Sequence, residues 1–280
     1  MASPPGGPRD EYLLGHANEE LERLVRQARF FGAITDHLFR EAGIGPGMRV
    51  LDAGCGAGDV AFAVARIVGP SGQVVGIDRS PEAVWLAARR AEADGLENVA
   101  FRVADVANVG DPLEPDGFDA LVGRLVLMYA PDAAAWLRQL VRAVKPGGIV
   151  TFQEFDMEGA TSDPPCPLYE TAGHRLREAF RRGGAQTRMG LRLGRVFEDA
   201  GLPAPRMLLG ARVERGPDSP AYQQVADVTR TLLPLMEKTG VATAAEVGIE
   251  TLAARLRDEA VGLGSTLILP LLVGAWARKS

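Results

Sequence analysis

A glycine-rich segment gives the strongest chemical signal in this chain of 280 residues. Residues 50–58 read VLDAGCGAG, an apolar run followed by three glycines at alternate positions. Glycines directly after a buried strand let the backbone turn sharply and approach a ligand closely, and the helix that follows presents unpaired N–H groups at its start. The segment therefore predicts a loop that binds a ligand.

Two further acidic residues stand where apolar runs end. Asp78 ends the run VVGID, about 20 residues after the glycine loop, where an acid can accept hydrogen bonds from ribose hydroxyls. Asp105 follows the run AFRVA, and beside Val106 its carboxylate could accept from an exocyclic amine while apolar neighbours enclose an aromatic base. Together the three segments fit an adenosine that lacks a phosphate.

Two common nucleotide sites are disfavoured by the residues that follow the loop. The dinucleotide fingerprint GxGxxG requires glycine at position 59, where the chain has Asp59. That carboxylate would also repel a pyrophosphate at the start of the helix. The phosphate loop of nucleotide triphosphatases is excluded as well, because no Gly-Lys-Ser/Thr follows.

The elements that would position these residues alternate along the first half of the chain. Short apolar runs predict strands, and apolar residues at three- and four-residue spacing predict helices. The expected strands are residues 48–53, 73–77, 99–103, 120–127 and 149–155, and the expected helices are 18–42, 60–68, 81–94 and 133–144. This alternation predicts βαβ units and a parallel sheet with both faces covered.

After residue 156 the alternation stops. The expected helices there are residues 169–182 and 195–200, one that opens at Ser219-Pro220 and kinks at Pro234, and 252–260; the expected strands are 204–214 and 265–277. We expect the last strand to insert antiparallel beside 204–214. The result would be a doubly wound, mostly parallel α/β sheet of seven strands with a helical lid.

Composition narrows the class of partner. The chain has 31 basic and 36 acidic residues and a net charge of −5, which disfavours nucleic acid or anionic lipid as the main partner. Cys55 and Cys166 are isolated and the three histidines are scattered, so neither a metal site nor a disulfide framework is expected. The N-terminal residues do not resemble a signal peptide, and the longest apolar stretch, 267–277, is too short to span a bilayer. We expect a cytoplasmic protein, monomeric or homodimeric, without membrane contact.

The motifs together resemble a known family. VLDAGCGAG, GID, AD, FDALVGRLVLMY and KPGG occur in the order and spacing of class I methyltransferases that use S-adenosylmethionine (SAM). The similarity is greatest to the small-molecule group that includes enzymes of ubiquinone and menaquinone biosynthesis and bacterial natural-product methyltransferases. It implies a Rossmann-like fold in one compact domain, with an N-terminal helical lid segment (1–45), a SAM-binding core (46–155), and a part (156–280) that supplies the remaining strands and the substrate-binding lid.

The resemblance also implies roles for individual residues in binding SAM and its product, S-adenosylhomocysteine. Gly54 and Gly56 would pack against the methionine part, with Asp52 near its amino group. Asp78, followed by Arg79, would hold the ribose, and Asp105 and Val106 the adenine. Arg124 would lie beside the cofactor or acceptor, unless it pairs with a carboxylate at the sheet edge. Gln27 could reach the carboxylate of SAM, unless it lies on a solvated helix face.

Candidates for the chemistry come from the segments that would frame the pocket. Glu154, which follows the fifth strand with Asp156, is the candidate acidic residue facing the acceptor, and an unrelated ion pair is its alternative. Tyr12 and His16 precede the first helix and could touch either ligand or serve as an aromatic anchor and a surface histidine. His174 could be a base or a substrate contact, or a surface histidine on its helix.

The sequence thus predicts methyl transfer to O, N or C of a small, apolar or aromatic metabolite, with natural-product biosynthesis as a plausible setting. Two alternatives remain open. The first is a SAM-binding protein with another catalytic activity or none. The second is a protein or nucleic-acid methyltransferase, which the net acidity and the residues at 124–127 disfavour.

Overall fold

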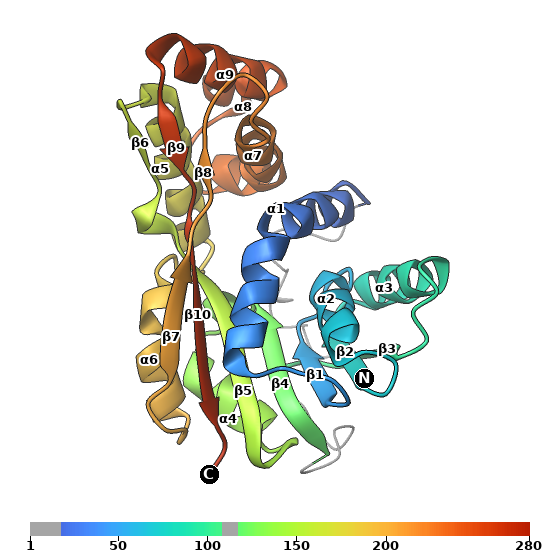
Figure 1. Ribbon diagram of the computed structural model, residues 1–280. Coiled ribbons are helices and arrows are strands. Elements are labelled where there is room, and N and C mark those ends of the chain that lie inside the picture. The colour runs from blue at the N-terminus through green and yellow to red at the C-terminus, as the bar shows by residue number, and fades with distance from the viewer. Residues whose placement is uncertain (1–17, 108–116) are drawn as a thin grey trace, which may run out of the picture.

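The computed structural model describes residues 18–107 and 117–280, and its central feature is a sheet with the strand order β3-β2-β1-β4-β5-β10-β7 (Figure 1). The strands are β1 (Arg49–Ala53), β2 (Gln73–Asp78), β3 (Val99–Val103), β4 (Phe118–Arg124), β5 (Val144–Asp156), β7 (Arg206–Gly210) and β10 (Leu271–Arg278). Strands β1 to β5 pair in parallel, and β10 inserts antiparallel between β5 and β7. The expected sheet of seven strands is confirmed, and the order reverses beside β1, where open α/β sheets bind ligands.

Helices cover both faces of this sheet. They are α1 (Asn18–Ala42), α2 (Asp59–Val68), α3 (Pro81–Ala93), α4 (Ala133–Val141) and α6 (Met189–Asp199). Val50 of β1 belongs to the apolar cluster that includes residues of α1 and α2, whereas its neighbour Leu51 belongs to the cluster that includes residues of α4 and α6. Because both sides of β1 are buried, its sequence is a continuous apolar run instead of an alternating one.

Side-chain caps fix the starts of α3 and α4. Ser80 is the N-cap of α3, where its hydroxyl accepts a hydrogen bond from the N–H of Ala83. Asp132 caps α4 through the N–H of Ala135. Each cap satisfies one of the N–H groups that a helix start leaves without an intrahelical partner, and thereby fixes where the helix begins.

Several strand boundaries differ from expectation for identifiable reasons. β4 ends at Arg124 because Leu125 has a φ of 58°, which a strand cannot accommodate, and a short 3₁₀ helix, η1 (Leu127–Tyr129), follows. β5 begins at Val144, so residues 145–148 lie in the strand instead of forming a turn before it. The expected last strand is divided into β9 (Thr266–Ile268) and β10, since Pro270 has no N–H to donate to a ladder.

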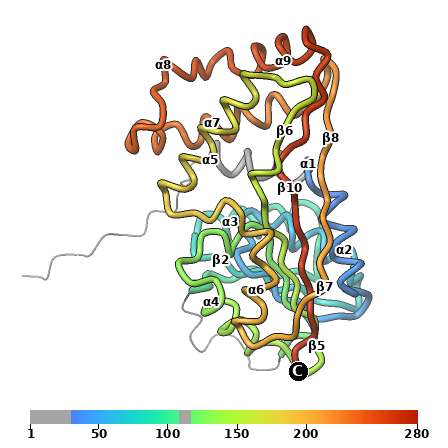
Figure 2. The backbone as a smooth tube through the Cα atoms, turned by 90° about the vertical axis from the view of Figure 1, so that its left-hand side faces the viewer, coloured from blue at the N-terminus to red at the C-terminus, as the bar shows by residue number. Residues whose placement is uncertain are grey.

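A second group of elements lies beyond the carboxyl ends of the parallel strands (Figures 1 and 2). It contains a small antiparallel sheet, β6-β9-β8, and four α-helices. Its further elements are β6 (Thr161–Asp163), α5 (Pro167–Arg182), β8 (Val213–Glu214), α7 (Ala221–Lys238), α8 (Ala244–Val247) and α9 (Leu252–Leu263). We call residues 161–182 and 213–268 the cap. The cap has its own apolar cluster, which includes Tyr169, Tyr222 and Leu256.

Within the described ranges, no helix combines the length and apolar character needed to cross a membrane.

Candidate active site

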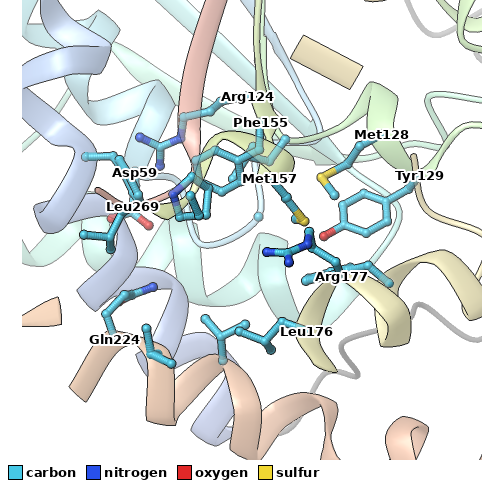
Figure 3. A pocket seen from close by; sticks show the side chains of 18 of the residues that line it. Asp59, Arg124, Met128, Tyr129, Phe155, Met157, Leu176, Arg177, Gln224 and Leu269 are labelled. Atoms are coloured by element: carbon cyan, nitrogen blue, oxygen red, sulfur yellow. The ribbon is translucent and has the colours of Figure 1, made fainter. Parts of the chain in front are cut away.

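A cavity lies between the cap and the carboxyl ends of β1, β2, β4 and β5 (Figure 3). Its wall on the sheet side is formed by the glycine loop, Asp78 and Arg124, and its wall on the cap side by residues of α5 and α7. Apolar side chains dominate the space between them, among them Phe31, Met128, Phe155, Met157, Leu176, Phe180, Val228 and Leu269. The cavity therefore joins a polar edge of the sheet to an apolar chamber under the cap.

The glycine loop follows β1 with a backbone that favours glycine. Gly54, Gly56 and Gly58 have φ values of 70°, 51° and 90°. A Cβ at Gly54 would lie 2.6 Å from Cγ2 of Val126, so the loop packs against the turn after β4 with no room for a side chain. The loop leads directly into α2, whose first residue, Asp59, lines the cavity and accepts a hydrogen bond from Nη2 of Arg90 at 2.7 Å.

Asp78 connects the end of β2 to the glycine loop. Its Oδ2 accepts a hydrogen bond from the N–H of Gly56 at 2.9 Å, and its Oδ1 accepts from the N–H of Ser80 at 3.0 Å. The side chain also lines the cavity. A carboxylate held in this way is preorganised toward a ligand, because its position does not depend on the ligand's presence.

Asp52 is buried beneath the glycine loop with 1% of its surface exposed. Neither of its carboxyl oxygens has a hydrogen-bond partner among the described residues. Burial raises the pKa of Asp52 well above its ordinary value, and the charge of Arg124 opposes that shift. A buried carboxyl without a donor costs free energy, so an amino group placed beside it would be stabilised.

Arg124 ends β4 and lines the cavity. Its Nη1 donates to Oγ1 of Thr35 on α1 at 2.9 Å. Burial lowers the pKa of Arg124, and the carboxylates of Asp59 and Asp52 oppose that shift. Arg124 therefore lies in the electrostatic field of these carboxylates, and its role beside the cofactor or acceptor stays a prediction.

Glu154 does not occupy the position expected of it. Its side chain is fully buried, and its Oε1 accepts hydrogen bonds from the N–H groups of Val126 and Leu127 at 2.9 and 2.7 Å. Burial raises its pKa to about 8. Neighbouring side chains of a strand point to opposite faces, and on β5 it is Phe155, not Glu154, that lines the cavity. Glu154 therefore positions the turn after β4 and is not placed to touch an acceptor.

His174 is also placed differently from the expectation. It is exposed, whereas Gly173, Leu176 and Arg177 of the same helix α5 line the cavity. Successive residues of a helix are about 100° apart around its axis, so His174 falls outside the inward face. The structure offers no contact of this histidine with the cavity.

Of the remaining residues predicted to form the site, some are not described by the structure and others lie at strand ends. Tyr12 and His16 lie outside the described residues, and Gln27 lies in α1 at a position whose side chain is not described. The other three lie at the ends of β2 and β3: Arg79 and Asp105 are exposed, and Val106 is buried. Oδ1 of Asp105 accepts a hydrogen bond from the N–H of Ala107 at 2.8 Å. Neither Asp105 nor Val106 is among the described residues that line the cavity, so their role with adenine stays a prediction.

Sequence reasoning missed the polar residues that the cap contributes, Arg177 and Gln224. One signal for Arg177 was available, because it stands within the apolar stripe formed by Tyr169, Leu176 and Phe180 of an otherwise polar helix. An arginine on the buried face of an amphipathic helix is unusual and needs a partner. No comparable signal marked Gln224.

No group of three or more histidine, cysteine or acidic side chains suited to a metal occurs in residues 18–107 and 117–280.

Comparison with known proteins identifies the family. Residues 44–201 match the family described as a methyltransferase domain, and the chain belongs to that family. A demethylmenaquinone methyltransferase of Lactococcus lactis is 32% identical over 126 residues, which cover 45% of this chain and 47% of the relative. The chain spans about half the length of the curated relatives it matches first.

Solved structures confirm the fold. A putative methyltransferase from Bacillus halodurans superimposes with a TM-score of 0.58 at 16% identity, covering 88% of this chain and 98% of that one. A phosphoethanolamine N-methyltransferase from Haemonchus contortus, solved in complex with SAM, gives a TM-score of 0.54 at 18% identity, covering 89% of this chain and 53% of that one. The mostly parallel, seven-stranded Rossmann-like fold is therefore that of methyltransferases.

Proposed function

We propose that the protein transfers a methyl group from SAM to an oxygen, nitrogen or carbon atom of a small, apolar or aromatic molecule. The observation that carries this proposal is a single cavity with two kinds of wall. The glycine loop and Asp78 form its polar end, and aromatic, aliphatic and methionine side chains under the cap form the rest. Membership of the methyltransferase domain family and the name of the menaquinone relative support the same activity.

The residues at the sheet edge fit SAM. Asp52 lies beneath the glycine loop with two buried carboxyl oxygens that lack donors in the described structure, but it is not among the described residues that line the cavity, so its place near the amino group of a methionine moiety stays a prediction. The glycine loop lets a ligand approach the backbone, and the carboxylate of Asp78 faces the cavity where a ribose would lie. Asp105 and Val106 would hold the adenine at the end of β3. When bound, SAM supplies a methyl group that is activated by the positive sulfonium.

The chain itself contributes orientation and a dry environment. Phe155, Met157, Leu176 and Leu269 surround the space next to the sheet edge and would exclude water from a bound acceptor (Figure 3). The two carboxylates that line the cavity are already engaged: Asp59 pairs with Arg90, and Asp78 holds backbone N–H groups. We therefore infer that neither carboxylate takes a proton from the acceptor, so the acceptor reacts as an ionised oxygen, a neutral amine or a nucleophilic carbon, with Tyr12 as the remaining candidate to receive a proton.

The enclosed apolar chamber favours a small molecule over a protein or nucleic acid as acceptor. A cytoplasmic location and a monomeric or homodimeric state belong to the same proposal.

Binding of SAM and S-adenosylhomocysteine is the first test. We expect both to bind with one site per chain in isothermal titration calorimetry and to raise the melting temperature, because a ligand that binds only the folded state stabilises it. ATP and NAD serve as matched controls and should not bind, since Asp59 at the start of α2 repels phosphates. Absence of binding by SAM and its product at millimolar concentration would refute the proposal.

The acceptor itself is best found by incubating the protein with methyl-labelled SAM and a collection of small aromatic metabolites. Label transferred to an extractable product would separate the proposed activity from the alternative of a SAM-binding protein without methyl transfer. Binding of SAM combined with no transfer to any small molecule would favour that alternative.

A further inference from the structure

Arg177 brings a positive charge into the apolar part of the cavity. The guanidinium lies on the same side of the cavity as Met157 and Tyr129 (Figure 3). Its one ion pair in the described structure joins its Nε to Oε2 of Glu158 at 3.3 Å, and the Glu158 side chain is 39% exposed. With the Arg177 side chain 20% exposed and a nitrogen–oxygen distance of 3.3 Å, this partly exposed pair leaves the guanidinium only weakly engaged. The remaining N–H groups of Arg177 have no hydrogen-bond partner among the described residues.

The other charged side chains of the cavity are better satisfied. Arg124 donates to Thr35 and lies in the field of several carboxylates. Asp59 forms a hydrogen-bonded ion pair with Arg90 at 2.7 Å. Among the described cavity residues, Arg177 is therefore the cation with the most capacity left for a ligand.

Gln224 presents a second group without a partner. It lies on α7 across the cavity from Arg177 and lines the wall near Leu269 (Figure 3). Only 7% of the residue is exposed, and its side-chain amide makes no hydrogen bond within the described part of the chain, yet the amide atoms are not among the fully buried polar atoms. The amide therefore faces the cavity, where it can donate to or accept from a ligand's hydroxyl or carbonyl group.

The chamber between these two groups sets the shape of the ligand. Leu176, Phe180 and Val228 offer it only apolar contacts. An apolar body in this space would be favoured by the hydrophobic effect, while a guanidinium at one end favours an anionic oxygen.

We propose that the methyl acceptor is an aromatic molecule with an anionic oxygen, either a carboxylate or an ionised phenol, that binds to Arg177. A second polar group at the opposite end of the molecule hydrogen-bonds to Gln224. That the bound molecule is a methyl acceptor rests on the proposed function. That the cavity binds an aromatic anion does not depend on the proposed function. Arg177 is thereby a specificity-determining residue.

The test compares two probes that differ by one charge and adds a second kind of anion. We would titrate 2-naphthoate, its neutral analogue 2-naphthamide, and 2,4-dinitro-1-naphthol, a phenol that is ionised at neutral pH, into the protein with and without S-adenosylhomocysteine. We expect at least one of the two anions to bind at least tenfold more tightly than the amide, and the two anions separate a carboxylate from a phenolate preference. Arg177→Met should abolish the difference, and Arg177→Lys should retain part of it.

Arg181→Met is the matched control, because Arg181 lies one helical turn further along α5, is 58% exposed, pairs with Glu178 and does not line the cavity. It should leave all affinities within twofold. For the opposite end, 6-hydroxy-2-naphthoate should bind several-fold more tightly than 2-naphthoate to the unmodified protein, and Gln224→Leu should remove that gain alone.

Equal affinity for anions and amide in the unmodified protein, or a preference that survives in Arg177→Met, would overturn the proposal, and so would a failure of all probes to bind at millimolar concentration. Failure of the proposed function is recognised separately, because it would show as no binding of S-adenosylhomocysteine while the naphthoate preference is still measured in its absence. Melting curves of each variant exclude unfolding as the cause of a lost affinity.

Discussion

Asp78→Ala is expected to weaken the binding of S-adenosylhomocysteine by more than tenfold, or about 1.4 kcal/mol. Two effects combine in this variant. The ribose loses its acceptor at the end of β2, and the N–H groups of Gly56 and Ser80 lose the carboxylate oxygens that they contact at 2.9 and 3.0 Å. Hydrogen bonds to a charged group contribute roughly 1.5–3 kcal/mol each, so the tenfold figure is a lower bound. Titration calorimetry measures the change directly.

Asp132→Ala is the control for this substitution. Asp132 also accepts a backbone hydrogen bond after a loop, from Ala135 at 2.9 Å, but it caps α4 away from the cavity. It should reduce stability by about 1 kcal/mol and leave the affinity unchanged. If Asp78→Ala binds within twofold of the unmodified protein, the assignment of the ribose site is wrong. Melting curves of Asp78→Ala without ligand show whether the substitution also destabilises the folded protein through the glycine loop.

Glu154→Ala is expected to have the largest effect on stability of the substitutions considered. Removing the carboxyl leaves the N–H groups of Val126 and Leu127 buried without an acceptor, at about 1–3 kcal/mol each. Glu154→Gln keeps one acceptor oxygen at nearly the same place and should lose much less. Urea denaturation of the three proteins at pH 6 gives the two differences, and equal losses in both variants would contradict the positioning role.

The same residue predicts how stability depends on pH. The pKa of Glu154 is about 8 in the folded protein and roughly 4.3 in an unfolded chain. Below pH 4 both the folded and the unfolded state hold the proton of Glu154, and the free energy of unfolding is not reduced by its ionisation. As the pH rises toward 8 the unfolded state releases the proton and the folded state retains it, so the free energy of unfolding falls.

Glu154→Gln cannot titrate and lacks this contribution. The unmodified protein should therefore lose more stability between pH 5 and pH 8 than the variant does, as measured by urea denaturation at both values. Parallel pH profiles for the two proteins would show that the burial of Glu154 does not affect its ionisation.

The part of the site that could be predicted from sequence is the part that local signals specify. The glycine loop is recognisable because Gly54 and Gly58 serve backbone conformations that other residues avoid, and Asp78 because it ends a short apolar run. Ser80 predicts the start of α3, because its capping hydrogen bond involves only the next few residues. These features need no knowledge of distant parts of the chain.

The site residues that could not be predicted from sequence are those whose role depends on which face of a strand or helix is turned toward the cavity. Both faces of β5 are buried, so the pattern around Glu154 has no polar side to identify the face toward the cavity. The helical interpretation of α5 was correct, but choosing between His174 and Arg177 required knowing which face of the helix is turned toward the cavity. The end of β4 was placed too late because the positive φ of Leu125 has no signal in its residue type.

The order in which the chain builds the cap restricts how a new specificity can be acquired by exchange of segments. The cap consists of residues 161–182 and 213–268, and between them the chain returns to the large sheet to form α6 and β7. Its apolar cluster draws Tyr169 from the first stretch and Tyr222 and Leu256 from the second. A chimera with a single crossover would combine two unmatched halves of one hydrophobic interior. Recombination that transplants the acceptor chamber from a relative must therefore replace both stretches at once, whereas point substitution at the cavity wall can proceed one residue at a time.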